Sequence, residues 1–189
     1  FASGYFISNL GGGAIANGLG VGARLDLTNC TFFGNSTSSE GAHNESGGAL
    51  LNRYSSQATI SNCIFWGDLA PLKPEISGAG STIRNCIIQG SFVNGLWNAS
   101  LGANNGGNLD QDPRFFDAAH IAGPDGILPS IDDGLRPRFY SPGVDAGWSP
   151  GAPAADILGD ERYHGPDIGA YEVLALDFPE AAQDWALYR

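Results

Sequence analysis

The sequence predicts an all-β protein: right-handed parallel β-helix coils, followed by an irregular, Asp-rich C-terminal region packed on them. Three segments align on a shared Asn-Cys pair, at Asn29-Cys30, Asn62-Cys63 and Asn85-Cys86. Glycine is frequent, with 28 of 189 residues, and only 15% of residues are charged, a composition typical of turn-rich β structure. Apolar residues alternate with polar ones on both sides of each Asn-Cys pair, as they do in strands.

The repeat has the length of one coil of a solenoid. Cys30 and Cys63 lie 33 positions apart, and Cys63 and Cys86 lie 23 apart. The longer interval contains a polar insert at 36–46, which we interpret as a surface loop. Without this insert both intervals fall in the low twenties, which is within the range of solenoid repeats.

Side-chain parity predicts a sharp bend at each asparagine. Leu27 and Phe32 have opposite parity, so both can face inward only if the chain bends between them. Asparagine tolerates the left-handed conformation that such a bend needs. Stacked about 4.8 Å apart, the asparagines would bond along a ladder beside buried, reduced thiols. The predicted structural ladder is Asn29, Asn62, Asn85, Cys30, Cys63 and Cys86.

The residues that alternate with the inward positions form an apolar strip on the outside of the coils. This strip consists of Phe33, Ile64, Trp66 and Ile87. A strip of this kind needs a cover or a partner. We expect the C-terminal region to cover it with Phe115, Phe116, Phe139 and Tyr140. If Trp66 is instead exposed, the strip is a candidate glycan or partner site.

The length suits one domain with a single core. We place the β-helix coils at residues 1–107 and a C-terminal covering segment of the same domain at 108–189. The motif at 6–9 matches the closing part of a repeat, so the first coil lacks a cap and would expose strand edges. We therefore expect residues 1–10 to pair with a second chain. A filament of chains stacked end to end is one alternative.

Motifs in both halves resemble those of bacterial surface proteins. The Gly-Gly-Ala elements at 12–14 and 47–49 and the Phe-x-x-Asn elements at 6–9 and 32–35 resemble polymorphic outer-membrane protein repeats. The motifs at 108–117, 141–147, 156–162 and 167–172 occur in the order seen in choice-of-anchor Q proteins, whose C-terminal β-helix region they resemble. The resemblance covers residues 4–172 and implies a secreted or surface-displayed bacterial protein. It carries no activity over to particular residues.

Charge and hydropathy exclude two classes of partner. The formal net charge of −11 repels phosphate backbones and anionic lipid surfaces, so nucleic acid is not expected as a partner. No apolar run approaches the ~20 residues of a membrane span. We expect no cofactor other than calcium, for which Asp110, Asp112 and Asp117 are the best cluster of carboxylates. The alternative is that these aspartates shape turns by bonding their own backbone.

The C-terminal motifs allow a catalytic interpretation and a structural one. Asp156, Arg162, Asp167 and Glu172 include the paired carboxylates that a glycosidase or lyase uses. The simpler interpretation is an arginine that pins the C-terminal segment through the carboxylates. Aromatic residues that could stack on sugar rings are Tyr54, Trp97, Tyr140 and Trp148.

We therefore expect a non-catalytic, extracellular structural or adhesive module. It would present a rigid acidic surface to a glycan, to a protein at the cell surface or to copies of itself. The alternative is a carbohydrate-active enzyme, either a polysaccharide lyase or a glycosidase, which only an analogy of fold supports.

Overall fold

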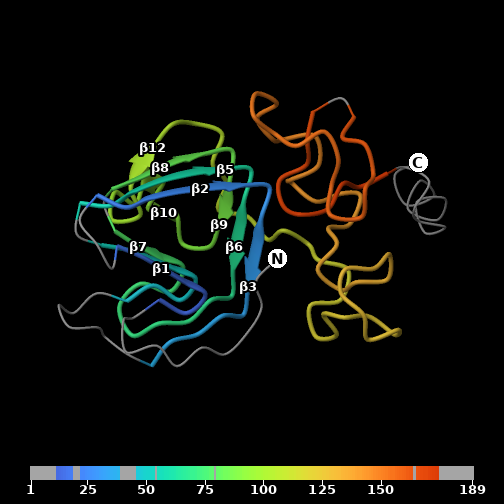
Figure 1. Ribbon diagram of the computed structural model, residues 1–189, viewed down its shortest axis with the longest axis horizontal. Coiled ribbons are helices and arrows are strands. Elements are labelled where there is room, and N and C mark those ends of the chain that lie inside the picture. The colour runs from blue at the N-terminus through green and yellow to red at the C-terminus, as the bar shows by residue number, and fades with distance from the viewer. Residues whose placement is uncertain are drawn as a thin grey trace.

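The computed structural model describes residues 12–18, 22–38, 46–53, 55–78, 80–163 and 165–174. Within these ranges the chain is all-β: it forms strands, turns and bridges, and no helix. Parallel strands make three sheets, which enclose a common interior (Figure 1). The expected contact of residues 1–10 with a second chain lies outside the described residues.

The chain passes three times through the three sheets in the same order. The first pass contains β1 (Ile15–Asn17), β2 (Arg24–Thr28) and β3 (Thr31–Phe33). The second contains β4 (Leu50–Asn52), β5 (Gln57–Ser61) and β6 (Ile64–Trp66). The third contains β7 (Ile76–Ser77), β8 (Ser81–Arg84) and β9 (Ile87–Ile88). Each sheet takes one strand from every pass, giving β1-β4-β7, β2-β5-β8 and β3-β6-β9.

Equivalent residues of successive passes lie side by side. Leu27 pairs with Ile60, which pairs in turn with Ile83. Phe32 pairs with Phe65, and their rings stack with centroids 4.6 Å apart and 7° between their planes. Because side chains alternate across a strand, this register keeps equivalent side chains of successive passes on the same face of each sheet.

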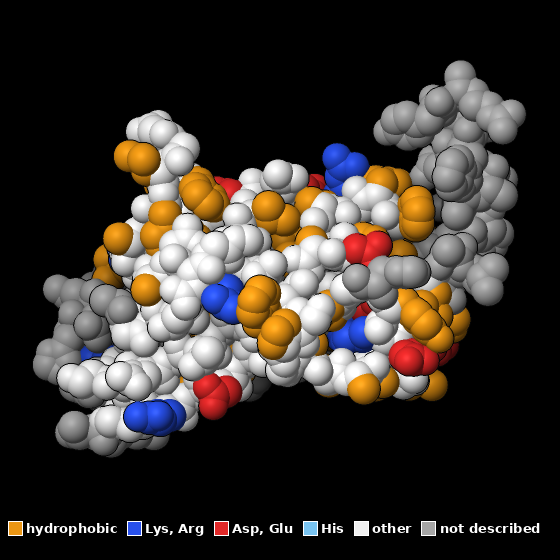
Figure 2. All heavy atoms as spheres, turned by 90° about the horizontal axis from the view of Figure 1, so that it is seen from above, with side chains coloured by type: hydrophobic (Ala, Val, Ile, Leu, Met, Phe, Trp, Pro, Cys, Tyr) orange, Lys and Arg blue, Asp and Glu red, His pale blue; other side chains and the backbone are white. Residues whose placement is uncertain are grey.

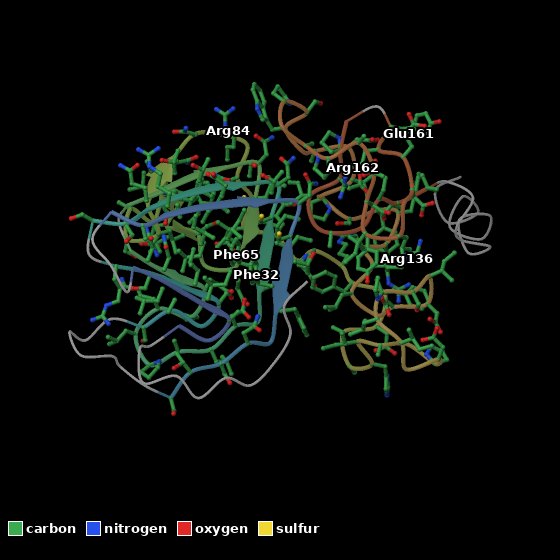
Figure 3. All side chains as sticks on the ribbon, in the orientation of Figure 1. Phe32, Phe65, Arg84, Arg136, Glu161 and Arg162 are labelled. Carbon is green, nitrogen blue, oxygen red and sulfur yellow. The ribbon has the colours of Figure 1, made fainter. Side chains whose placement is uncertain are left out.

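The interior between the sheets is the main hydrophobic core. Leu50, Ile60, Phe65, Ile83 and Ile88 are fully buried there, and Figure 3 shows Phe32 and Phe65 side by side within it. Truncating such an aliphatic side chain to alanine costs roughly 2–5 kcal/mol, because transfer energy is lost and a cavity is left. The core is therefore the main source of stability of the three passes.

The pattern changes after the third pass. β10 (Phe92–Val93) and β11 (Leu96–Trp97) form an antiparallel hairpin. Its turn residues Asn94 and Gly95 have φ values of 53° and 78°, as a two-residue turn between such strands requires. β12 (Ala103–Asn104) then continues the β2-β5-β8 sheet by pairing with β8.

The described chain after Asn104 forms turns and isolated bridges. It lies beside the β3-β6-β9 sheet, as the yellow-to-red trace of Figure 1 shows. Antiparallel bridges join Phe115 to Pro137 and Ala155 to Glu161. The loop at 117–134 is closed at its base, where Asp117 N donates to Gly134 O at 2.9 Å.

Candidate functional site

The three predicted corner asparagines lie between the β2-β5-β8 and β3-β6-β9 sheets. Asn29, Asn62 and Asn85 all have left-handed backbone conformations, with φ of 50°, 53° and 46°. Asn62 Nδ2 donates to Asn29 Oδ1 at 3.1 Å, so one step of the ladder is formed directly. Asn85 Nδ2 donates instead to Ala146 O at 2.9 Å.

The corner also anchors the C-terminal region, a role that the sequence analysis did not predict. Asn29 Nδ2 donates to Asp167 O at 2.8 Å. Asn62 accepts from Trp148 N at 2.7 Å and donates to Trp148 O at 2.9 Å. These partners are backbone groups more than 80 residues away, and no sequence motif marks a backbone group as an acceptor.

The three cysteines are free thiols stacked in adjacent passes. Cys30 N lies 3.5 Å from Cys63 Sγ, and Cys63 N lies 3.3 Å from Cys86 Sγ. Cys63 and Cys86 are buried, whereas Cys30 is partly exposed. Burial raises the pKa of Cys63. A thiol that resists ionisation is a poor nucleophile and metal ligand, which favours a packing role.

The outer strip, which was considered as a glycan or partner site, lies largely beneath the C-terminal region. Ile64 and Ile87 are fully buried beneath Ile168, and Trp66 packs against the same cluster. Phe33 meets Phe115 edge-on, with ring centroids 5.4 Å apart. The same chain therefore covers the strip.

Only one of the four aromatic residues expected to cover the strip does so. Phe115 packs there, while Phe116, Phe139 and Tyr140 are 37%, 42% and 46% exposed. Ile168 covers the strip instead, because the motif at 167–172 lies against the corner asparagines. Gly169 allows this close approach: a Cβ there would lie 2.8 Å from Ile64 Cδ1.

The three aspartates of the predicted calcium cluster act separately. Asp110 accepts from Gly90 N and Phe92 N, and Asp112 accepts from Arg114 N. Asp117 accepts from Ala119 N at 3.1 Å. Backbone N–H groups take up all three carboxylates: the donors are local for Asp112 and Asp117 and lie 20 and 18 residues away for Asp110. In the part of the chain that the structure describes, no three His, Cys, Asp or Glu side chains are grouped to hold a metal.

Arg162 and its carboxylates form a buried structural network. Arg162 Nη1 contacts Glu172 Oε2 at 2.8 Å, and the two side chains are 4% and 3% exposed. Figure 3 shows Arg162 inside the C-terminal part. Asp156 accepts from Glu172 N, and Asp167 accepts from Asp145 N and Val173 N. Backbone donors thus occupy the proposed acid/base set, and the arginine pins the last described segment.

An aromatic pocket opens beside the closed loop at 117–134. Its volume is about 270 Å³, and it is lined by Phe116, Asp117, His120, Gly123, Pro124 and Asp132. The guanidinium carbon of Arg138 lies 4.9 Å from the centroid of the Phe116 ring. Asp117 Oδ2 and His120 Nδ1 are 2.8 Å apart. One wall of the pocket is therefore an exposed ring and the others carry polar groups.

Both carboxylates of the aromatic pocket are held in the ionised form. The hydrogen bond with His120 lowers the pKa of Asp117, and the hydroxyl of Ser130 lowers the pKa of Asp132. An ionised carboxylate has several lone pairs, so it can accept from a ligand as well as from these neighbours. The loop that carries them is anchored by Tyr171, whose hydroxyl donates to Asp133 Oδ2.

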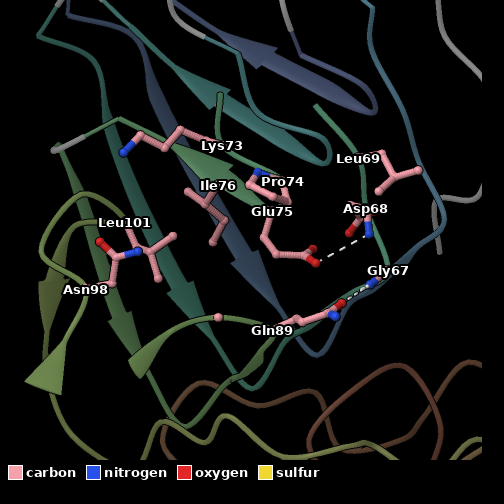
Figure 4. A pocket seen from close by; sticks show the side chains of 11 residues that line it. Gly67, Asp68, Leu69, Lys73, Pro74, Glu75, Ile76, Gln89, Asn98 and Leu101 are labelled. Atoms are coloured by element: carbon pink, nitrogen blue, oxygen red, sulfur yellow. Dashed lines mark hydrogen bonds between the residues drawn. The ribbon is translucent and has the colours of Figure 1, made fainter. Parts of the chain in front are cut away.

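A second pocket lies where residues 67–69, 73–76 and 89–90 meet Asn98 and Leu101. Its volume is about 300 Å³, and its lining includes Asp68, Lys73, Glu75, Gln89, Asn98 and Leu101 (Figure 4). We call it the carboxyl pocket. Asp68 and Glu75 are only 1% and 3% exposed. Asp68 N donates to Glu75 Oε1 at 3.3 Å, and Asn35 N and Nδ2 each donate to Asp68 Oδ1 at 2.7 Å.

The two carboxyl groups share their environment and titrate together. Burial and the hydrogen bond with Asp68 raise the pKa of Glu75 to about 10. Burial also raises the pKa of Asp68. At neutral pH Glu75 therefore keeps its proton. Sequence reasoning missed this pair, although the register offers a signal: Glu75 stands level with Ala49.

Searches of family models, of curated proteins and of solved structures found no match to the chain. The functional assignment therefore depends on the site geometry and the sequence motifs. The structure adds one finding on membranes: in its described part, no helix has the length and apolar character of a membrane span.

Proposed function

We propose that this chain is a right-handed parallel β-helix that acts outside the cell as a non-catalytic adhesive module. In this proposal the aromatic pocket beside Phe116 binds a glycan. The three-pass arrangement and the common interior core support the β-helix. Right-handed crossovers are the rule for parallel strands, which supports the handedness. The resemblance to choice-of-anchor Q proteins supports the extracellular location.

The aromatic pocket is the observation that carries the glycan proposal. Sugar rings offer apolar C–H faces and a rim of hydroxyl groups, so their sites combine an aromatic ring with fixed hydrogen-bonding groups. Phe116 supplies the ring, and Asp117, His120 and Asp132 supply the polar groups. Arg138 lies against Phe116 and holds the ring in place.

The charge of the chain favours a neutral glycan. A formal net charge of −11 repels polymers of uronic acids and sulfated sugars. The carboxylates of the aromatic pocket add to this repulsion because both are ionised. Other exposed aromatic residues, Tyr140 and Trp148, are packed against Arg114 and Arg84 and offer further contacts for a long polymer. On the face shown in Figure 2, hydrophobic side chains form small separate groups between polar ones.

The enzyme alternative has less support. A glycosidase needs two carboxyl groups roughly 5–9.5 Å apart on either side of the scissile bond. Asp68 and Glu75 are hydrogen-bonded to each other, which is too close for this geometry. The carboxylates around Arg162 are occupied by the arginine and by backbone N–H groups.

Affinity electrophoresis tests the proposal. Native gels would contain soluble neutral polysaccharides, namely mannan, xyloglucan and mixed-linkage glucan, or the anionic polygalacturonate. We expect at least one neutral polymer to retard the protein and polygalacturonate to have no effect. Phe116→Ala should weaken the retardation at least tenfold, and Asp132→Asn should weaken it less.

The matched control is Leu96→Ala, which removes another exposed apolar side chain, 74% exposed, from the distant hairpin. It should leave the retardation unchanged. The proposal fails if no neutral polymer retards the protein or if Phe116→Ala binds as well as the wild type. Release of reducing ends from any of these polymers would favour the enzyme instead.

A further inference from the structure

We propose that the carboxyl pocket is a calcium site in which Asp68 and Glu75 are the protein ligands. This inference is independent of the glycan proposal, because the two pockets share no lining residue. It also differs from the cluster of aspartates considered on the sequence, since those residues lie elsewhere.

Two buried carboxyl oxygens face this pocket with no partner beyond the other carboxyl group. Asp68 Oδ2 and Glu75 Oε2 are buried, and apart from the contact between the two carboxyl groups neither oxygen has a hydrogen-bond partner among the described residues. The other oxygens of the two groups are used, by Asn35 and by Asp68 N. Leaving a buried acceptor of a charged group unmatched is costly. Figure 4 shows the Glu75 side chain extending through the pocket toward Asp68, where its Oε1 accepts from Asp68 N.

Among the residues that the structure describes, no salt bridge pairs a cation with either carboxyl group. Lys73 is the basic residue of the pocket lining, and Figure 4 shows its side chain extending away from both carboxyl groups. A buried carboxylate is normally paired or bound to a metal, and a cation that binds here must displace the proton that Glu75 holds at neutral pH. Gln89 and Asn98, which also line the pocket, are neutral amides. A bound cation would supply the missing charge.

The repeat shows that the stack of strands does not require these carboxyl groups. Glu75 stands in register with Ala49, which stands in register with Ala14. Asp68 likewise stands in register with Asn35, beside the bridge of Ser36 to Leu69. At the level of Glu75 the two earlier passes carry alanine, and at the level of Asp68 the first pass carries asparagine. The chain itself indicates the mildest substitutions: Asp68→Asn and Glu75→Ala.

Calcium is the cation that suits this site. It takes oxygen ligands, accepts 6–8 of them in flexible geometry, and completes its shell with water. A cavity of about 300 Å³ has room for the ion and several waters. Magnesium requires a stricter octahedron and releases its own waters reluctantly. Two carboxyl ligands from the protein predict weak binding, with a Kd of roughly 0.1–1 mM, as in extracellular calcium modules.

The test is equilibrium dialysis of the full chain against radioactive calcium, after treatment with a chelator. We expect saturable binding of one calcium ion per chain. Asp68→Asn and Glu75→Ala should each weaken binding at least tenfold. Calcium at 10 mM should raise the Tm of the wild type by several degrees, and the shift should disappear in both variants. Magnesium at the same concentration should produce a smaller shift.

Asp112→Asn is the matched control, because it removes one carboxylate from an exposed turn outside the pocket. It should bind calcium like the wild type. Far-UV circular dichroism without calcium checks that each variant is folded, and Glu75→Gln replaces Glu75→Ala if the latter is not. The proposal is overturned if no saturable binding occurs, if both pocket variants bind normally, or if Asp112→Asn alone loses the ion.

Discussion

Trp148 N donates a 2.7 Å hydrogen bond to Asn62 Oδ1, and Asn62 Nδ2 donates back to Trp148 O at 2.9 Å. This reciprocal pair joins the second pass to a turn 86 residues later in the chain. Asn62 is fully buried and Trp148 is 42% exposed, so both bonds are partly shielded from water. A single side chain thus fixes the bend between two sheets and the position of the C-terminal region.

Substitutions at Asn62 should separate these two roles. Asn62→Gly keeps the left-handed conformation and loses the side-chain bonds, whereas Asn62→Ala loses both. We expect Asn62→Ala to lower the free energy of unfolding by roughly 3–5 kcal/mol. The decrease for Asn62→Gly should be smaller than that for Asn62→Ala by about 1–2 kcal/mol. Urea denaturation followed by tryptophan fluorescence measures the difference. Equal losses in the two variants would show that the φ of 53° is not strained for alanine here.

The cysteines should react with thiol reagents in an order set by burial. Cys30 is partly exposed and should be the first to be labelled in the native protein, although the hydrogen bond with Cys63 and burial raise its pKa and slow the reaction. Cys63 and Cys86 are fully buried and should react only as fast as the chain opens. Denatured protein should be labelled at three sites. Rapid labelling of Cys63 in the native state, located by mass spectrometry of peptides, would contradict the stacked arrangement.

Gly169→Ala should release the C-terminal cover from the outer strip. Its Cβ would lie 2.8 Å from Ile64 Cδ1, on a backbone with φ of 111°. We expect strain and overpacking to lower the free energy of unfolding by roughly 3 kcal/mol. Tryptophan emission should shift to the red as Trp66 becomes exposed to solvent. Gly159→Ala is the control: its φ is 93°, and a Cβ there meets no atom within 4 Å. A red shift of equal size in the control would exclude close packing as the cause.

Stability should fall as the pH rises from about 4 to about 7. Burial raises the pKa of Asp167 to about 7, and burial raises the pKa of Glu172 as well. In this window the folded protein holds a proton that the unfolded chain has released, so increasing pH favours unfolding. The Asp167 contribution is on the order of a few kcal/mol and is constant above pH 7. Asp167→Asn should flatten the slope, measured by urea denaturation at several pH values. An unchanged slope would assign the effect to other groups.

The repeated elements could be predicted from the sequence because stacking in register makes the pattern visible. The Asn-Cys pairs, with their parity switch, indicate the bends and the stacked thiols before any coordinates exist. The cover was harder to predict. Ile168 rather than Phe139 lies on Ile64 because Gly169 permits the approach and Asn29 binds the adjacent carbonyls. Such choices depend on backbone positions that carry no periodic signal.

The candidate sites were missed for a related reason. Phe116 looks like any core aromatic in the sequence, and only the fold of the loop at 117–134 leaves it exposed. Glu75 departs from an alanine register that becomes clear only when the pairing of β4 with β7 is known. The aromatic pocket lies outside the repeated passes, and the carboxyl pocket lies where the chain departs from its repeat.

The position of Ile168 has a consequence for biosynthesis. The ribosome completes Ile64 and Ile87 long before it reaches the segment that buries them, and domains begin to fold while the chain is still growing. During that interval a nascent chain exposes an adhesive apolar stripe to its neighbours. A nonsense mutation between Asn108 and Ile168 would make this exposure permanent. We expect such truncated products to aggregate in the translating cell, although every strand of the three sheets is already complete.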